Sequence, residues 1–295
     1  MFCSFCIVPS TRGREISRAA AKIEAEVHAL AEQGILEITL LGQTVNAYGR
    51  HDVRRGRAAA AGTMPFAELL TRLDAIPGLA RIRYTSPHPL FFDADLIRAH
   101  RELERLCPHV HLPAQSGSDR ILEAMRRRYT RSRYLEIVAE LRTARPDLAL
   151  TSDLIVGFPG ETDDDFEQTL DLVREAGLID SFSFKYSPRP GTSALDLANA
   201  VPAELAQERL TRLQDLQRAQ TLAYHQSRVG EDALVLIDGA SRRGGRQLSG
   251  RDLHHRVVNL EPDPGHEIEP GSVVAARILE ATPHSMLAEP LNQDF

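Results

Sequence analysis

The feature that most constrains the fold is an alternation of helical and strand-like segments between residues 17 and 187. The helical segments repeat apolar residues at intervals of three and four, and the strand-like segments are short apolar runs that end in Gly, Pro or polar residues. This alternation predicts βα units, a parallel sheet and right-handed crossovers, which bring the carboxyl ends of all strands to one face. Strands are expected at 35–41, 81–86, 109–115, 148–158 and 181–187, and helices at 17–33, 66–76, 94–106, 131–143 and 163–176.

Polar, uncharged side chains gather at the predicted carboxyl ends of the strands. Gln43 and Asn46 follow one strand, and Gln115 and Ser116 follow another. Gly and Pro at such positions need no role beyond turn formation. Amides and hydroxyls are less expected there, and sheets of this kind place their ligand sites at this face. We therefore expect a binding site at the carboxyl ends of the strands.

The pattern changes after residue 191. A long amphipathic helix is expected at 203–229, followed by short strands at 233–237, 256–260 and 272–279 with Gly, Asp and Pro turns between them. This predicts an α/β region at 1–229 and a small all-β barrel at 230–293. The low-complexity stretch 50–62 is predicted to be a flexible, solvated insertion.

Composition excludes some classes of function. No run of about 18 apolar residues is present, and the first residues lack the order of a signal peptide, so we predict a cytoplasmic protein without membrane contact. The net charge of -6 argues against a protein that coats nucleic acid non-specifically. A local basic patch remains compatible with it.

Three cysteines are present, which does not suit a disulfide framework. Cys107 is expected to be a small buried apolar residue. Cys3 and Cys6 form a Cys-x-x-Cys pair, which suits half a zinc site, a redox pair or an iron–sulfur loop. No second such pair completes a zinc site, and Pro9 and Gly13 precede the first predicted long helix, unlike in a redox pair. Spacing alone leaves the iron–sulfur loop as one of these alternatives.

Motifs along the chain help to interpret the Cys3–Cys6 pair. Residues 3–15 resemble the last two thirds of the Cys-x₃-Cys-x-aromatic-Cys loop of radical-SAM enzymes. The chain also resembles the MiaB-type tRNA methylthiotransferases of that superfamily at 41–48, 111–118, 125–130, 152–162 and 182–192, and a TRAM domain at 247–251 and 256–259. The resemblance covers essentially the whole chain. It implies a partial parallel (β/α) barrel of radical-SAM type that lacks its first strand, followed by a small all-β TRAM barrel.

The resemblance also implies a reaction. Three cysteines of such an enzyme hold a 4Fe-4S cluster, whose fourth iron stays open for S-adenosyl-L-methionine. The implied product carries a methylthio group on C2 of N(6)-dimethylallyladenosine next to the anticodon in tRNA. The implied partners are tRNA, an external electron donor, and a sulfur source or auxiliary cluster in an N-terminal domain that this sequence lacks.

Site residues follow from the matching motifs. Cys3 and Cys6 are the implied metal ligands, and Phe5 is the aromatic beside the adenine. The other implied cofactor contacts are Gln43 and Asn46 at the amino-acid end, Gln115, Ser152 and Asp153 near the ribose, and Ile155, Gly157 and Phe158 near the adenine. The implied RNA-binding residues are Arg242, Arg243, Arg246, Arg251 and Arg256.

The sequence departs from the family at its beginning. The first cluster cysteine and the strand that leads into the loop would both precede Met1. We expect a truncated form rather than a degenerate one, because the remaining motifs are intact. The missing strand would leave an exposed edge on the strand that ends near Gly42, and the chain is expected to be a poor or inactive enzyme.

Other functions stay open at this point. Within the family, the alternative substrates are a threonylcarbamoyl-adenosine in tRNA and an aspartate of a ribosomal protein. The motif at 112–118 and the TRAM sequence favour the dimethylallyl type. From other classes, the chain is a non-catalytic RNA-binding module that acts through its C-terminal barrel, or a zinc-binding scaffold.

Overall fold

The computed structural model describes residues 3–13, 16–241, 244, 246–262 and 268–291. Five parallel strands form the centre, with β1 paired to β2 and β4 paired to both β3 and β5. An isolated parallel bridge between Ile82 and Leu106 links the two sheets. The strands are β1 (Glu37–Leu40), β2 (Arg81–Tyr84), β3 (His109–His111), β4 (Ala149–Val156) and β5 (Asp180–Lys185). The predicted alternation of strand and helix is therefore confirmed.

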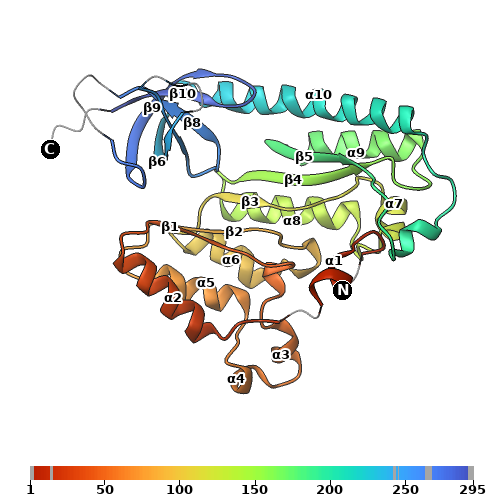
Figure 1. Ribbon diagram of the computed structural model, residues 1–295, viewed down its shortest axis with the longest axis horizontal. Helices are drawn as coiled ribbons and strands as arrows, with labels where there is room; N and C mark the ends of the chain where they lie inside the picture. Colours follow the sequence, from red (N-terminus) through yellow and green to blue (C-terminus); the bar gives the residue numbers. More distant parts are fainter. Residues whose placement is uncertain (1–2, 14–15, 242–243, 245, 263–267, 292–295) are drawn as a thin grey trace.

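Long helices cover the outer face of these strands (Figure 1). They are α2 (Ala20–Glu32), α5 (Phe66–Asp74), α6 (Ala94–Glu102), α8 (Arg131–Ala144), α9 (Asp163–Glu175) and α10 (Ala203–Ser227). Residues of β4 alternate between the two faces, so Leu150 and Leu154 are fully buried in the main apolar core with Val173 of α9. Thr151, Asp153 and Ile155 consequently face the other way, into the space that the strands enclose.

Several short elements lie outside the predicted pattern. They are α1 (Val8–Arg12), α3 (Arg50–Arg54), α4 (Ala58–Ala61), α7 (Asp119–Ala124) and the 3₁₀ turns η1 (Val45–Ala47), η2 (Pro89–Phe91) and η3 (Ser193–Asp196). The stretch 50–62, predicted to be a flexible, solvated insertion, contains the two short helices α3 and α4, and neither helix has a buried residue. Arg and Ala are strong helix formers, and Gly62 ends α4 in a left-handed conformation.

The C-terminal part is a closed five-stranded barrel with the strand order β10-β8-β7-β6-β9. Its strands are β6 (Asp232–Ala240), β7 (Leu248–Arg251), β8 (Val257–Leu260), β9 (Val273–Ala281) and β10 (Met286–Pro290). It has an aliphatic core of its own, which includes Val235, Val258 and Ile278. The sequence predicted β6, β8 and β9, but not β7, which contains Ser and Gly, nor the short β10.

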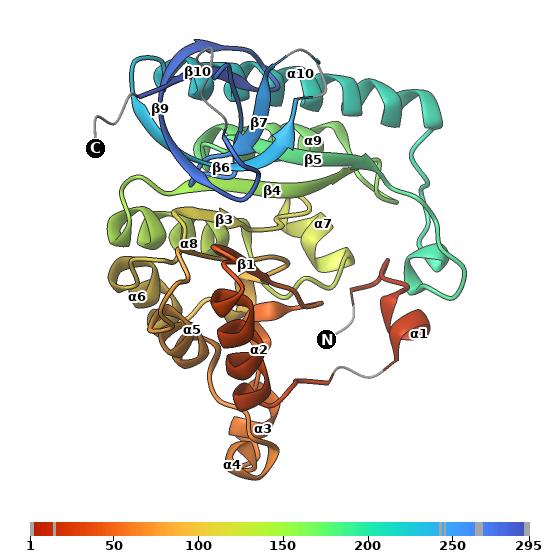
Figure 2. The same cartoon turned by 60° about the vertical axis from the view of Figure 1, so that its left-hand side comes forward.

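The barrel packs against the amino ends of the parallel strands, and charged residues dominate this contact. The guanidinium of Arg81 donates to the carbonyl oxygens of Arg251 (3.0 Å) and Leu234 (2.8 Å). Arg256 of the barrel pairs with Asp180 at the start of β5, with 2.7 Å between nitrogen and oxygen. The opposite, carboxyl ends of the strands therefore stay clear of the barrel, as both views show (Figures 1 and 2).

Candidate functional site

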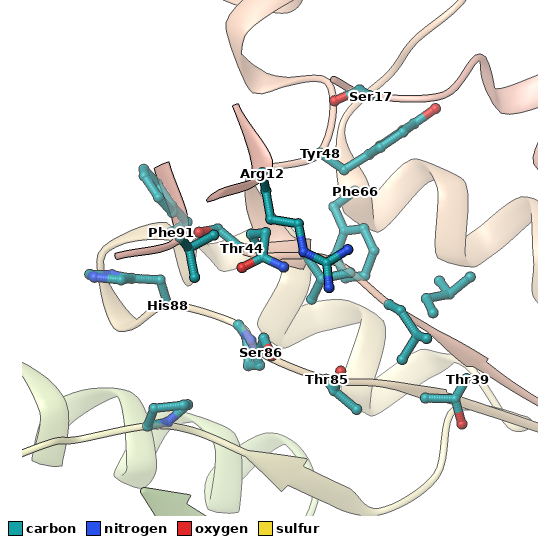
Figure 3. A pocket seen from close by; sticks show the side chains of 18 of the residues that line it. Arg12, Ser17, Thr39, Thr44, Tyr48, Phe66, Thr85, Ser86, His88 and Phe91 are labelled. Atoms are coloured by element: carbon teal, nitrogen blue, oxygen red, sulfur yellow. The ribbon is translucent and has the colours of Figure 1, made fainter. Parts of the chain in front are cut away.

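A cavity of about 1110 Å³ lies at the carboxyl ends of the parallel strands. The segments that line it come from far apart in the sequence and include the cysteine loop, the turns after β1 and β2, and the end of β3. Figure 3 shows Arg12, Thr44, Ser86 and His88 around this space. Of the predicted site residues, the cavity wall contains Cys3, Phe5, Cys6, Gln43, Gln115 and Asp153. Of the four polar residues expected at the strand ends, Gln43 and Gln115 reach this cavity, whereas Asn46 and Ser116 are not among its lining residues.

The cysteine loop is fixed by the backbone of Ser4. The Ser4 N–H donates to the carbonyl oxygen of Met125 (3.0 Å), and its hydroxyl donates to that of Ala124 (2.8 Å). The Ser4 carbonyl accepts from the N–H of Ala194 (2.9 Å). These bonds tie the loop to the end of α7 and to η3, and they leave the Cys3 and Cys6 thiols half-buried at the cavity wall.

A buried arginine stands beside one of the thiols. Nη1 of Arg127 lies 3.4 Å from Sγ of Cys3, and its Nη2 donates to the carbonyl oxygen of Pro113 (3.0 Å). Its Nε donates to the hydroxyl of Tyr129 (3.1 Å), so the guanidinium is held on three sides. The sulfur of Cys3 therefore has a fixed positive charge beside it. The sequence motif at 125–130 included Arg127 but did not indicate this role.

Unusual backbone conformations mark the same region. Ser86 and Gln115, at the ends of β2 and β3, have positive φ values of 57° and 71° although neither is glycine. Arg126 and Arg128, on either side of Arg127, both have φ of 59°. Such conformations cost about 1 to 3 kcal/mol each and gather at functional sites. Their location around one cavity supports a binding role for it.

Asn46 was predicted to approach a cofactor, but its amide is used in a loop contact. Oδ1 of Asn46 accepts from the N–H of His88 (2.8 Å), and its Nδ2 donates to the carbonyl of the same residue (3.0 Å). Asn46 is buried and is not among the residues that line the cavity. It therefore joins the turns after β1 and β2 and presents His88 to the cavity.

His88 is held as a neutral imidazole. Burial, followed by the charge of Arg127, lowers its pKa to about 3. Nδ1 accepts from the N–H of Leu90 (3.2 Å), and Nε2 has no hydrogen-bond partner among the residues that the structure describes. His88 lines the cavity, but its Nε2 atom is buried.

The predicted residues of β4 and the following turn lie mostly behind the cavity wall. The Ser152 hydroxyl is fully buried, donates to the Leu112 carbonyl (2.8 Å) and accepts from the Ala114 N–H (2.9 Å). The Gly157 N–H donates to the Glu161 carboxylate (2.9 Å). Ser152 and Gly157 therefore shape the site through the backbone.

An aromatic cluster supports the cysteine loop from behind. The ring of Phe158 is fully buried and meets the rings of Phe5 and Tyr186 edge to face, with centroids 6.2 and 5.1 Å apart. Ile155 packs against the same cluster. Phe158 and Ile155 therefore support Phe5, and Phe5 itself lines the cavity.

The predicted RNA-binding arginines do not share one environment. Arg242 and Arg243 lie outside the described residues, and Arg246 is exposed before β7. Arg251 is 39% exposed and lies 3.8 Å from the Asp238 carboxylate. Arg256 is 11% exposed and turned toward Asp180, so its charge faces the parallel strands rather than solvent.

The remaining cysteine is separate from this site. Cys107 is buried near Arg81, Arg83 and Glu37 at the amino ends of the strands, and burial raises its pKa to about 11. In the described part of the chain, no cluster of three or more His, Cys, Asp or Glu side chains could hold a metal ion. The described helices also include none with the length and hydropathy needed to cross a bilayer.

Comparisons with known proteins agree with these features. The family model of the Radical SAM superfamily matches residues 1–173. The tRNA-2-methylthio-N(6)-dimethylallyladenosine synthase 1 of Mycobacterium marinum is 46% identical, and the alignment covers 97% of this chain and 56% of the relative. A synthase with the same activity in its name, from Geobacter metallireducens, is 48% identical, with 98% and 63% covered. The chain thus spans less than two thirds of these relatives.

A solved structure shares the fold. The radical S-adenosylmethionine methyltransferase TsrM from Kitasatospora setae, with cobalamin and a 4Fe-4S cluster bound, superposes with a TM-score of 0.51 at 19% identity. The match covers 65% of this chain and 36% of that one. At this identity, the likeness concerns the fold alone.

Proposed function

Because the chain belongs to the radical SAM superfamily, we propose that it contains the catalytic core of a tRNA methylthiotransferase. The proposed reaction adds a methylthio group to C2 of N(6)-dimethylallyladenosine next to the anticodon. The observation that carries the proposal is the pair of half-buried thiols at a large cavity, together with 46–48% identity to relatives that are named for this activity. The motif resemblance seen in the sequence agrees with these relatives.

The described residues fit part of the implied metal group. Cys3 and Cys6 offer two thiolates at the wall of one cavity, with Arg127 to balance negative charge. A third thiolate is needed for a 4Fe-4S cluster with one open iron, and Cys107 is buried elsewhere. When bound, the cluster and S-adenosyl-L-methionine supply an organic radical that activates a C–H bond.

The chain's own residues have orienting roles in this proposal. Gln43, Gln115 and Asp153 present polar groups to the cavity, where the amino-acid and ribose parts of S-adenosyl-L-methionine need hydrogen bonds. Arg12 points into the same space and suits a carboxylate (Figure 3). Phe5 provides an apolar ring for the adenine. Gln43, Asn46, Ser152 and the turn at 155–158 together shape this binding surface.

Further parts of the proposal concern partners and domains. The partners are tRNA, an external electron donor, and a sulfur source or auxiliary cluster. The radical-SAM core comprises 1–229, and the closed barrel at 230–293 is a TRAM domain that contributes Arg246 and Arg251 to tRNA phosphates. The proposed location is the cytoplasm, where tRNA is modified.

The activity is tested by nucleoside mass spectrometry of tRNA from a strain that lacks the gene. Loss of the 2-methylthio group, with accumulation of N(6)-dimethylallyladenosine, is the expected result. Loss of a methylthio group from threonylcarbamoyl-adenosine instead would assign the chain to a sibling enzyme. Unchanged tRNA would overturn the proposal.

The metal site is tested by anaerobic reconstitution with iron and sulfide, followed by iron analysis and EPR spectroscopy. Cys3→Ser and Cys6→Ser should each lower the iron content relative to the parent chain. Cys107→Ala is the matched control, because this thiol lies outside the cavity. We expect weak cluster binding from this chain alone, and a stable cluster that cleaves S-adenosyl-L-methionine would contradict that expectation.

A further inference from the structure

Two phenylalanines on β5 are exposed although the strand is part of the central sheet. Phe182 is 63% exposed and Phe184 is 53% exposed. The opposite face of β5 is directed at α10, because Nζ of Lys185 donates to the Gln207 side chain of that helix (2.8 Å). Side chains alternate along a strand, so Phe182 and Phe184 face the space that the parallel strands enclose.

The strand register connects this aromatic pair to the cavity. Phe182 is paired with Asp153, which lines the cavity, and Phe184 is paired with Ile155, which packs on the cluster around Phe158. The ring of His111 meets the ring of Phe182 with centroids 6.0 Å apart. The pair therefore lies beside the site already described, on the wall formed by β4 and β5.

The exposed surface of Phe182 and Phe184 beside the cavity suits an apolar or aromatic ligand group. A fully buried phenylalanine removes roughly 150–250 Å² from water, and more than half of each of these residues remains exposed, which is unfavourable. A purine base stacks on aromatic rings, and a branched hydrocarbon substituent has no polar atoms that would need partners. Both parts of a prenylated adenosine thus match the surface.

Charge beside the pair disfavours the main alternative. Oδ1 of Asp153 lies 3.3 Å from Nε2 of His111, and this carboxylate stands across the register from Phe182. A threonylcarbamoyl substituent would bring its own carboxylate next to it, and like charges at short range repel. A neutral apolar substituent avoids this repulsion.

We propose that Phe182 and Phe184 bind the base and the apolar N(6) substituent of the target adenosine and so select prenylated tRNA. This inference rests on the proposed function and adds the residues that decide specificity. It assigns them a binding role, with no part in the bond-making steps.

The test compares two anticodon stem-loop RNAs that differ by the dimethylallyl group alone. Their affinity for the full chain is measured by fluorescence anisotropy. The parent chain should bind the prenylated RNA about tenfold tighter or more, as expected for burial of a small hydrocarbon group. The double variant Phe182→Ser/Phe184→Ser should lose this preference, and its affinity for the unprenylated RNA should fall by a smaller factor, because the contact with the base is lost as well.

Matched variants separate apolar contact from damage to the fold. Phe182→Leu/Phe184→Leu keeps an apolar surface and should keep most of the preference. Ser183→Ala, on the opposite face of β5, should behave like the parent chain. If the double serine variant unfolds, Phe182→Gln alone makes the same test, with an expected loss of about threefold in the preference.

The outcomes distinguish this inference from the proposed function. If the parent chain binds neither RNA, the tRNA partner and this inference both fail. If it binds both RNAs equally, or if the serine variant keeps the preference, the role of Phe182 and Phe184 is wrong while the tRNA partner stands.

Discussion

The two ends of the parallel strands use their polar side chains in different ways. At the amino ends, Arg81, Arg83 and Glu37 are largely buried against the C-terminal barrel, and the arginines donate to its carbonyl oxygens. At the carboxyl ends, the cavity wall contains the amides of Gln43 and Gln115 and the thiols of the cysteine loop.

The amino ends hold the C-terminal barrel in place, and the carboxyl ends form the candidate binding site. A buried charge must be fully paired inside the protein, so the charges at the amino ends are used in the contact with the barrel. Polar side chains that line the cavity, such as Gln43 and Gln115, face the space where a ligand would bind. Substitutions should therefore lower stability at the amino ends and alter binding at the carboxyl ends.

The largest effect on stability is expected from Arg83→Met. Nε of Arg83 lies 3.1 Å from the Glu37 carboxylate, and its two terminal nitrogens donate to the carbonyls of Asp252 (2.8 Å) and Leu253 (3.0 Å). Removal of the guanidinium leaves Glu37 without this partner, which costs about 3–5 kcal/mol of unfolding free energy. Urea unfolding followed by circular dichroism measures it. Arg98→Met, at an exposed ion pair, is the control, and an equal effect in both would contradict the comparison.

Asn46→Leu should have the next largest effect. It removes both partners of the His88 backbone in a buried turn, which costs about 2 kcal/mol. Gln43→Leu, in the cavity wall, should leave the unfolding free energy nearly unchanged. If Asn46→Leu is as stable as the parent chain but binds S-adenosyl-L-methionine more weakly, Asn46 is a cofactor contact, as the sequence motif predicted.

The contact between barrel and sheet should weaken in acid. Burial, followed by the charges of Arg83, Arg251 and Arg256, lowers the pKa of His255 to about 3, and burial lowers that of His109, which stacks on it at 5.5 Å. The unfolded chain binds protons below the ordinary histidine pKa of about 6.5, whereas the folded one does not. Stability is therefore present above that pH and falls between pH 6.5 and 3, by about 1 kcal/mol per pH unit for His255.

This dependence is measured by urea unfolding at about pH 7 and about pH 5. His255→Gln should reduce the slope, because one titrating group is removed. His284→Gln, at an exposed position, is the matched control and should keep the slope of the parent chain. The same slope in the His255 variant would show that other groups cause the acid sensitivity.

The smallest effect on stability is expected from Arg251→Ala. Its side chain is 39% exposed, and its ion pair with Asp238 is long, so the unfolding free energy should change by less than about 1 kcal/mol. Its affinity for tRNA should fall a few-fold with a shallower salt dependence, because one phosphate contact is lost. Arg256→Ala should lower the unfolding free energy more and the affinity for tRNA less, since it breaks the pair with Asp180. Equal RNA effects of the two variants would contradict the environments described here.

Periodicity in the sequence determined most of the secondary structure. Apolar intervals of three and four specify helices such as α5, and short aliphatic runs specify strands such as β1, because these spacings put apolar groups on one face. The strand β7 was missed because its Ser249 and Gly250 carry no apolar alternation. Gly250 is required by packing, since a Cβ there would lie 2.2 Å from the Leu236 carbonyl oxygen.

The candidate site was only partly determined in this way. The order of the strands brings their carboxyl ends together, so the strand pattern placed Gln43 and Gln115 near one another, and the resemblance to radical-SAM enzymes added the cysteine pair. The direction of each side chain depends on neighbours that are distant in sequence. Asn46 turns to His88, Arg127 to Cys3 and Arg256 to Asp180.

The sequence by itself therefore determined the long helices and most strands, the strand ends where the site lies and the superfamily, since local periodicity and motif spacing are properties of the chain. Only the tertiary structure decided which polar groups hold the fold and which face the cavity. The physical reason is that a buried polar group takes whichever partner the packing brings to it, and those partners lie 42 to 124 residues away for Asn46, Arg256 and Arg127.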